Sequence, residues 1–451
     1  MARAKKETAL TPEERLQAAL VPDWEWPYKL PKNWCWTTVG TICDGFQYGY
    51  TEKATFEKIG PHFIRITDIG DGIINDSGAP YCKIDSDLFI KYKINKDDIL
   101  IARMGSVGEN GLATHNIDGV FASYLIRIVP RSNAKYVCNF LQTNLYWGQI
   151  SEKAQGTTRL NVNANVLKNL IIPLPPLAEQ QRIVDRIKSL FAKLDEAKEK
   201  AQAVVDSFET RKAAILHKAF TGELTAKWRE EHGSSIGHWK ECSIGDVFTH
   251  TTGKALKRNN QNGILKKYIT TSNLYWGTFD FSEVREMYFT NEELEKCTAK
   301  EGDLLVCNGG DVGRAAIWNY DYDICLQNHI SKLRRKTDSI SVPFFYYYFM
   351  FLKINGNIAG RGIGIASLSA KDLLAIKVYL PSMTEQQQIS HILDELFDKE
   401  QQTKEAAEAV LDRIDLMKKS ILARAFRGEL GTNDPSEESA VELLKRGLEK
   451  K

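Results

Sequence analysis

The sequence is poor in the features that mark several classes of protein. Its 451 residues include 8 cysteines with no Cys-x-x-Cys pair, so neither a zinc site nor a disulfide framework is favoured. Lys and Arg number 60 against 58 Asp and Glu, which excludes a polybasic nucleic-acid binder as a description of the whole chain. The longest apolar and aromatic run, residues 344–352, is too short to cross a bilayer. The first residues are charged and lack an apolar stretch, so we expect no secretory leader and a cytoplasmic location.

Sequence motifs of catalysis are also missing. The sequence has no Asn-Pro-Pro-Tyr or Asp-Pro-Pro-Tyr tetrapeptide, which an adenine-modifying methyltransferase needs to hold its target amino group. It has no His-Glu-x-x-His and no Gly-x-Ser-x-Gly motif. The segment TGKA at residues 252–255 lacks the earlier glycine and the following Ser or Thr of a phosphate loop. We therefore expect a binding protein with no catalytic residue, no metal site and no cofactor of its own.

The chain contains an internal duplication. The segment LPPLAEQQ at residues 174–181 returns as LPSMTEQQ at residues 380–387, which is 206 positions later. The segment KAFTGEL at residues 218–224 returns as RAFRGEL at residues 424–430, at the same offset. Farther upstream, DIL at residues 98–100 and DLL at residues 303–305 each precede a glycine-rich turn, at an offset of 205. This period is far too long for a solenoid unit and indicates a duplicated domain with its linker.

Each linker has the sequence pattern of one long helix. Apolar or small residues follow a 3.5-residue period over residues 177–219, and the second copy repeats the pattern with an interruption at its middle. A proline lies just upstream of each helix, and Gly222 or Gly428 follows it. We expect the two helices to pair with each other in antiparallel orientation. The alternative is that each helix only completes the core of its neighbouring domain.

The segments outside the helices predict strand-rich mixed domains. They contain short β-branched runs separated by Asn, Asp and Gly turns, with helices expected around residues 134–151 and 342–355. Capping patterns predict a short helix after Thr11 and another after Asp434. The predicted division is an N-terminal arm (1–30), a first domain (31–173), a first helical segment (174–226), a second domain (227–379), a second helical segment (380–430) and a C-terminal tail helix (431–451).

Both globular domains are mildly basic. Residues 30–172 carry a net charge of +2 and residues 237–379 a net charge of +3, whereas the rest of the chain is acidic. Several of their turns mix basic, aromatic and amide residues, and these turns fall at matching places in the two repeats. Lys and Arg bind phosphates, while Arg, Asn and Gln can contact base edges in pairs of hydrogen bonds. Any single one of these turns can equally be a solvated loop without a ligand. The occurrence of several such turns at matching places in both repeats favours DNA binding.

The repeated motifs resemble those of a known family. The blocks at residues 172–183 and 380–389, each leading into a long helix that ends in AFTGEL (219–224) or AFRGEL (425–430), resemble the DNA-specificity subunit of a type I restriction–modification system. LPKNW at residues 30–34 and IGHW at residues 236–239 also fit, although the second lacks the usual proline. The resemblance covers residues 30–430. It implies an α+β protein with two duplicated mixed α/β target-recognition domains and two long helices that form an antiparallel coiled coil with pseudo-twofold symmetry.

The resemblance also implies a division of labour. Each domain would recognise one half of a bipartite, gapped site in double-stranded DNA, and the helices would set the gap. Two modification subunits would dock on the helices and hold S-adenosylmethionine, and restriction subunits would use ATP and Mg. This chain would be a non-catalytic subunit that binds none of these cofactors itself. Three alternatives remain open: a coiled-coil scaffold without DNA specificity, a self-sufficient DNA enzyme with an unrecognised site, and a specificity subunit of a phage-defence methylase that has no nuclease.

Loop position, basic or amide character and repeat equivalence select the candidate DNA-contacting residues. They are Tyr48, Tyr50, Lys53, Arg65, Thr67, Arg103, Ser106, Ser123, Tyr124, Thr157, Thr158, Arg159, Lys254, Lys257, Arg258, Thr271, Asn273, Asn308, Asp311, Arg314, Asn328, His329 and Arg361.

Overall fold

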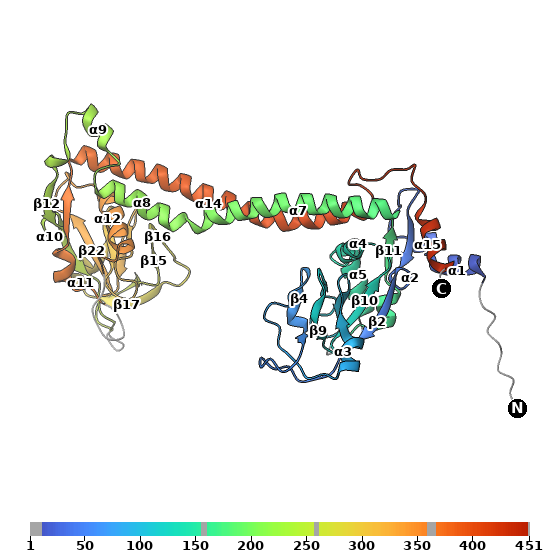
Figure 1. Cartoon of the computed structure of the whole chain (residues 1–451). Helices are drawn as coiled ribbons and strands as arrows, with labels where there is room; N and C mark the ends of the chain where they lie inside the picture. Colours follow the sequence, from blue (N-terminus) through green and yellow to red (C-terminus); the bar gives the residue numbers. More distant parts are fainter. Residues whose placement is uncertain (1–10, 155–159, 257–260, 359–366, 450–451) are drawn as a thin grey trace. The chain divides into compact units, whose positions relative to one another are not determined.

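The computed structural model describes residues 11–154, 160–256, 261–358 and 367–449 (Figure 1). The chain divides into two compact units. The first comprises Met1–Lys200 and Val410–Lys451, and the second comprises Ala201–Ala409. Each unit therefore holds one globular domain together with a part of each long helical segment.

The first unit is built from short strands and helices followed by a long helix. Its elements are α1 (Pro12–Ala19), β1 (Cys35–Thr38), α2 (Val39–Ile42), β2 (Cys43–Tyr48), β3 (His62–Ile64), β4 (Ile69–Gly70), β5 (Gly72–Ile74), α3 (Ser86–Tyr92), β6 (Lys93–Ile94), β7 (Ile99–Ala102), β8 (Asn110–Leu112), β9 (Ile117–Phe121), β10 (Leu125–Pro130), α4 (Ala134–Phe140), α5 (Asn144–Lys153), α6 (Ala164–Lys168), β11 (Ile171–Leu174), α15 (Ala440–Glu449) and the start of α7 (Leu177–Asp206).

The second unit repeats this plan. Its elements are α8 (Phe208–Phe220), α9 (Ala226–Glu231), β12 (Lys240–Ser243), α10 (Ile244–Val247), β13 (Phe248–Thr252), β14 (Ile264–Ile269), β15 (Leu274–Tyr275), β16 (Thr278–Phe279), β17 (Arg285–Phe289), α11 (Asn291–Cys297), β18 (Thr298–Ala299), β19 (Leu304–Cys307), β20 (Ala315–Ile317), β21 (Ile324–Leu326), β22 (Ile330–Arg335), α12 (Val342–Ile354), α13 (Ala370–Leu374), β23 (Lys377–Leu380) and most of α14 (Met383–Ala425).

The sheets of the two domains correspond strand by strand. The pair β1-β11 matches β12-β23, and the run β2-β10-β7-β8 matches β13-β22-β19-β20. The run β3-β9-β6 matches β14-β21-β18, with the first pair parallel and the second antiparallel in both domains. The first domain adds β5 and β4 at an edge, and the second adds β17 and the β15-β16 hairpin. The expected α+β fold with a shared, duplicated scaffold is confirmed.

The central sheet of each domain is buried on both faces. In β7, Ile99 and Ile101 enter the core beneath the helices, whereas Leu100 and Ala102 enter a second core on the opposite face. Successive side chains of a strand point to opposite faces, so a strand that is apolar throughout can support two cores. In the second domain, β19 divides its side chains between two cores in the same way.

The two helical segments pair in antiparallel orientation within each unit. In the first unit, Lys418 of α14 forms an ion pair of 2.6 Å with Asp195 of α7. In the second unit, Arg211 of α8 forms an ion pair of 2.7 Å with Glu400. The Lys404 ammonium lies 4.9 Å from the ring centroid of Phe208. Phe208 precedes Arg211 in α8, whereas its partner Lys404 follows Glu400 in α14, so the two helices run in opposite directions. The expected pairing is confirmed, and the alternative of two separate core helices is not supported.

The first helical segment departs from the expectation in one respect. It is not a single helix over residues 177–219, because a turn at Ser207 separates α7 from α8. The Ser207 hydroxyl donates to the Ala203 carbonyl at 2.6 Å, and the Ser207 amide donates to the same carbonyl at 3.1 Å. The second copy, α14, is continuous over Met383–Ala425.

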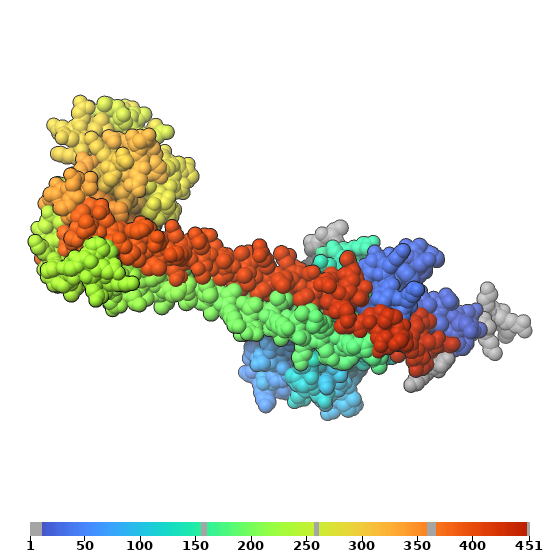
Figure 2. Space-filling model, turned by 90° about the horizontal axis from the view of Figure 1, so that it is seen from above, coloured from blue at the N-terminus to red at the C-terminus, as the bar shows by residue number. Residues whose placement is uncertain are grey.

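The two terminal segments lie against each other in the first unit. Helix α1 contacts α15, and Figure 2 shows the blue N-terminal segment beside the red C-terminal segment. The capping box predicted at Thr11 is present, and the Thr11 amide donates a hydrogen bond of 2.7 Å to the Glu14 carboxylate. The tail helix begins at Ala440 rather than just after Asp434. The Asp434 carboxylate instead accepts bonds from the amide and hydroxyl of Ser436, which form a local turn.

The repeated EQ pair in the two motifs fixes each long helix to its domain. Both glutamates and both glutamines are buried. Gln180 accepts a bond from the Asn133 amide at the start of α4, and Gln386 accepts one from the Ser341 amide at the start of α12. Each glutamine also donates to a carbonyl five residues before it. The motif is thus a set of specific bonds between a helix start and the adjoining domain.

The two glutamates have matched surroundings. Glu385 accepts bonds from Thr225 at 2.8 Å, Arg229 at 2.6 Å and the Trp239 indole at 3.0 Å. Glu179 accepts bonds from Thr432 at 2.8 Å and Arg182 at 2.7 Å. Thr225 and Thr432 both follow the end of the opposite long segment. Each glutamate therefore ties one helix start to the chain that leaves the other helix.

Candidate nucleic-acid interface

Three segments of the first domain form a small platform at the end of its central sheet. They are residues 48–50 after β2, residues 122–125 between β9 and β10, and the glycine loop 103–109 between β7 and β8. Backbone bonds join them: Tyr50 donates to Phe121 at 2.8 Å, Ser123 donates to Tyr50 at 2.9 Å and Arg103 donates to Tyr124 at 2.9 Å. The first-domain platform therefore brings together candidate residues from distant parts of the sequence.

The second domain has the same platform. Lys254 donates to Leu326 at 2.8 Å, Asn328 donates to Lys254 at 3.0 Å and Asn308 donates to His329 at 3.0 Å. These bonds match those of the first domain one by one. They pair Tyr50 with Lys254, Ser123 with Asn328, Tyr124 with His329 and Arg103 with Asn308.

The two glycine loops, 103–109 and 308–314, share one backbone conformation. Gly105 and Gly310 have φ of 74° and 70°, and Gly108 and Gly313 have φ of 92° and 88°, a region that favours glycine. A Cβ on Gly108 would lie 2.9 Å from Trp147, and one on Gly313 would lie 2.8 Å from Ile358. The glycines fix the backbone, while the loop side chains differ between the domains.

The first-domain candidates are mostly accessible. Tyr48, Lys53, Thr67, Ser106 and Tyr124 are exposed. An open cavity of about 380 Å³ is lined by five candidates among other residues, namely Tyr50, Arg65, Thr67, Ser123 and Tyr124. The sequence related these residues only by the type of loop that carries them, and the structure places them around one cavity.

The guanidinium of Arg65 is already engaged. Its Nε and Nη2 atoms donate to the Asp68 carboxylate, each at 3.0 Å. The hydrogen bond that Arg65 donates to Asp68 raises the pKa of Arg65, so the charge of Arg65 is held in an internal pair. Arg65 therefore supports the cavity wall and commits two of its five guanidinium N–H donors to Asp68.

Three second-domain candidates are buried and use their polar atoms internally. Asn273 donates to the carbonyls of Asp280 and Glu283, each at 2.9 Å, and its side-chain oxygen accepts from Thr270. Asn308 donates to the Asn328 carbonyl and to Ser331, and Lys254 donates to Glu293 at 2.6 Å. These contacts assign the three side chains a structural role in the folded domain.

Three other second-domain candidates form one group. Arg314 donates to the Thr271 carbonyl at 2.6 Å and lies 3.5 Å from Asp311. Its guanidinium lies 5.2 Å from the ring centroid of Tyr275, which is exposed on the β15-β16 hairpin. Sequence reasoning missed Tyr275, although an aromatic residue beside a glycine turn at residues 275–277 is a signal for it. Lys353 of α12 also contacts Asp311, at 2.8 Å.

The remaining second-domain candidates, Asn328 and His329, lie on the platform turn. His329 is exposed and Asn328 is half-buried. Six candidates fall outside the described residues: Thr157, Thr158, Arg159, Lys257, Arg258 and Arg361.

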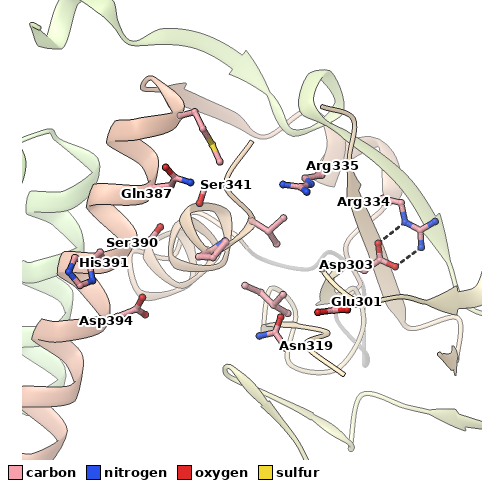
Figure 3. Close-up of a pocket in the computed structure, with 15 residues that line it drawn as sticks. Glu301, Asp303, Asn319, Arg334, Arg335, Ser341, Gln387, Ser390, His391 and Asp394 are labelled. Carbon is pink, nitrogen blue, oxygen red and sulfur yellow. Dashed lines mark hydrogen bonds and ion pairs between the residues drawn. The ribbon is translucent and has the colours of Figure 1, made fainter. Parts of the chain in front are cut away.

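A larger cavity lies elsewhere in the second unit, between α14 and the second domain. It has a volume of about 690 Å³, and Figure 3 shows Gln387, Ser390 and His391 of α14 on one side of it. On the other side, Arg334 donates two bonds of 2.7 Å to Asp303. Its charged lining mixes both signs and its acids and bases are partly paired, so the cavity favours no particular ligand.

Two negative findings apply to the described part of the chain. No three or more His, Cys, Asp or Glu side chains within it are grouped as a metal site would require. None of its helices is long and apolar enough to cross a membrane.

Comparisons with known proteins agree with the duplicated fold. The family model described as the type I restriction modification DNA specificity domain matches residues 37–205 and 237–411. The EcoKI specificity subunit of Escherichia coli strain K12 is 24% identical over 422 residues, covering 89% of this chain and 90% of that protein. The StySPI specificity subunit of Salmonella potsdam is 24% identical over 427 residues, with the same coverage of 89% and 90%.

A solved structure shares the fold. The HsdS subunit from Thermoanaerobacter tengcongensis aligns with a TM-score of 0.65 at 20% identity, over 90% of this chain and 99% of that one. The family match occurs twice, once over each of the two repeats, and together the matches span more than half of the sequence. This chain belongs to the family of type I restriction–modification DNA specificity proteins.

Proposed function

We propose that this chain supplies the DNA sequence specificity of a type I restriction–modification enzyme. Residues 31–173 and 227–379 each recognise one half of a bipartite site in double-stranded DNA, and the paired helices set the gap between the halves. The observation that carries the proposal is the duplicated platform, in which one set of backbone bonds presents different side chains in the two domains. A constant scaffold with variable side chains is what two different half-sites require.

The proposal extends to the partners of the chain. Two modification subunits dock on the helices and bring S-adenosylmethionine, and restriction subunits bring ATP and Mg. The chain itself is a non-catalytic subunit that acts in the cytoplasm. The small net charge of +2 fits this division, because the chain alone would bind DNA weakly and its partners would complete the grip on the duplex.

A rigid spacer makes the gap a geometric quantity. Dimeric DNA-binding proteins recognise the distance between half-sites in this way. Seven residues inserted after Lys200 and seven after Ala409 would keep the heptad pattern and add about 10.5 Å of helix. At about 3.4 Å per base pair this corresponds to about three base pairs.

The test is a genome-wide map of methylated adenines in cells with the original chain, with the double insertion and without the gene. We expect a gap longer by about three base pairs and unchanged half-sites with the double insertion. A single insertion after Lys200 is the control, and it should abolish methylation because it breaks the register of the helix pair. An unchanged gap would contradict the spacer role, and a methylation pattern independent of the gene would contradict the proposed function itself.

The scaffold alternative makes a different prediction. Phosphate contacts release counterions, so the DNA affinity of the purified chain should fall steeply with salt, by about 10³ or more between 50 mM and 200 mM salt if six or more phosphates are contacted. A scaffold protein without DNA specificity would show no such dependence.

A further inference from the structure

We propose that Arg103 is the residue of the first domain that recognises a guanine in its half-site, through a guanidinium held in place by Tyr48. This inference rests on the proposed function and adds a specific residue and a specific base to it. It is carried by the surroundings of Arg103, which differ from those of the other described arginines in its domain.

The other described arginines of the first domain have acceptors. Arg65 is bound to Asp68, Arg127 donates to the Lys93 carbonyl at 2.6 Å, and Arg131 donates to the Thr41 carbonyl. The guanidinium of Arg103 makes no hydrogen bond or ion pair with any described residue, and its Nε atom is buried without a partner. Of the described arginines of this domain, Arg103 alone commits none of its side-chain donors to another described residue.

Arg103 is nevertheless held in a defined place. Its guanidinium carbon lies over the Tyr48 ring, 4.8 Å from the ring centroid, within the range of a cation–π contact. The Tyr48 hydroxyl accepts a bond from the Ala164 amide at 3.1 Å, which fixes the ring from its other end. The Arg103 backbone is fixed as well, since its amide donates to Tyr124 and its carbonyl accepts from Val162.

This geometry suits a base edge. With Nε enclosed and the guanidinium held over the Tyr48 ring, the two terminal nitrogens remain as a fork of donors. Such a fork matches the O6 and N7 acceptors of guanine in the major groove, the commonest specific arginine contact with DNA. A phosphate would also accept from arginine, but a weakened phosphate contact lowers binding uniformly across sequences, whereas a weakened base contact relaxes the preference at one position. The substitution Arg103→Lys therefore separates the two kinds of contact.

At the position of the second domain that matches Arg103, the described chain has no arginine. Asn308 occupies the matching position and is turned inward onto Asn328 and Ser331. Its loop carries an arginine at the other end, but Arg314 is bound to the Thr271 carbonyl and lies beside Asp311. The effect of changing Arg103 should for this reason be confined to one half-site.

The experiment replaces the gene in its host by variants and maps methylated adenines with their flanking sequences. For Arg103→Lys we expect the preference for guanine at one position of one half-site to fall about 5- to 150-fold, with every other position unchanged. Tyr48→Leu removes the stacking face and should relax the same position. Arg131→Lys is the matched control, since Arg131 is bonded to the Thr41 carbonyl and is not part of the platform, and it should leave the recognised sequence unchanged.

Three results would overturn the assignment. The first is an unchanged recognition sequence with Arg103→Lys, and the second is a uniform loss of methylation at an unchanged sequence with the same variant. The third is that the half-site recognised by the first domain contains no guanine on either strand. If Arg103→Lys fails to assemble, Tyr48→Leu decides by the same criterion. All of these differ from failure of the proposed function, in which deletion of the gene leaves the methylation pattern as it was.

Discussion

The substitution Phe426→Ala tests how the end of the second long helix is attached to the first domain. Phe426 follows α14 and is 1% exposed. Its ring centroid lies 4.9 Å from that of Tyr136 and 5.6 Å from that of Phe140, both in α4. Truncation of a fully buried phenylalanine costs about 3–5 kcal/mol, because apolar burial is lost and a cavity remains. We expect a loss near 4 kcal/mol in the first unit.

Amide hydrogen exchange measured by mass spectrometry can locate this loss. Exchange reports local opening, so peptides covering α4 and the start of α7 should lose protection while those from Ala201–Ala409 keep it. Phe426→Leu is the control, and it should cost less than half as much because most of the apolar volume remains. Phe220→Ala is the matched change in the second unit. A loss below about 1 kcal/mol for Phe426→Ala, or a loss spread over both units, would refute this account of the attachment.

Three further substitutions have distinct expected outcomes. Glu385→Ala removes the partner of a buried Arg229 and should destabilise the second unit by about 3–5 kcal/mol in urea unfolding; a change near zero would show that the pair does not support the fold. Asn273→Ala should cost about 1–3 kcal/mol by leaving buried backbone groups unpaired, with an unchanged methylated sequence; an altered sequence would instead make Asn273 a base contact. Asp195→Asn removes an accessible pair with Lys418 and should cost less than about 1 kcal/mol in thermal unfolding, so a larger loss would mean that this pair is a main helix contact.

The long helices were predictable because their signal is periodic and local. A heptad pattern with a proline before it and a glycine after it predicts a helix wherever it occurs. The break at Ser207 was not predictable from that pattern, since the apolar period continues through it. Side-chain bonds are found at the break, where the Ser207 hydroxyl donates to the Ala203 carbonyl and the Arg211 guanidinium donates to the Val204 carbonyl. The start of the tail helix was misplaced for a similar reason, because Asp434 can cap either a helix or a short turn.

The candidate site was predictable only to the level of its loops. Turn residues at matching offsets of the repeat identified the segments that form the platforms. The direction of each side chain depends on pairing between distant strands, which one sequence does not reveal. Asn308 and Arg103 occupy equivalent positions, yet Asn308 points into the core and Arg103 stacks on Tyr48. An amide in a turn can serve the fold or a ligand, and only the tertiary structure separates the two.

The most direct test of the central claim is a domain exchange. Residues 31–173 are replaced by the corresponding domain of another specificity subunit whose recognition sequence is known, and methylated adenines are mapped across the genome. We expect one half-site to become that of the donor, while the other half-site and the gap stay the same. A change in both half-sites, or in the gap alone, would contradict the claim that each domain recognises its own half of the DNA site.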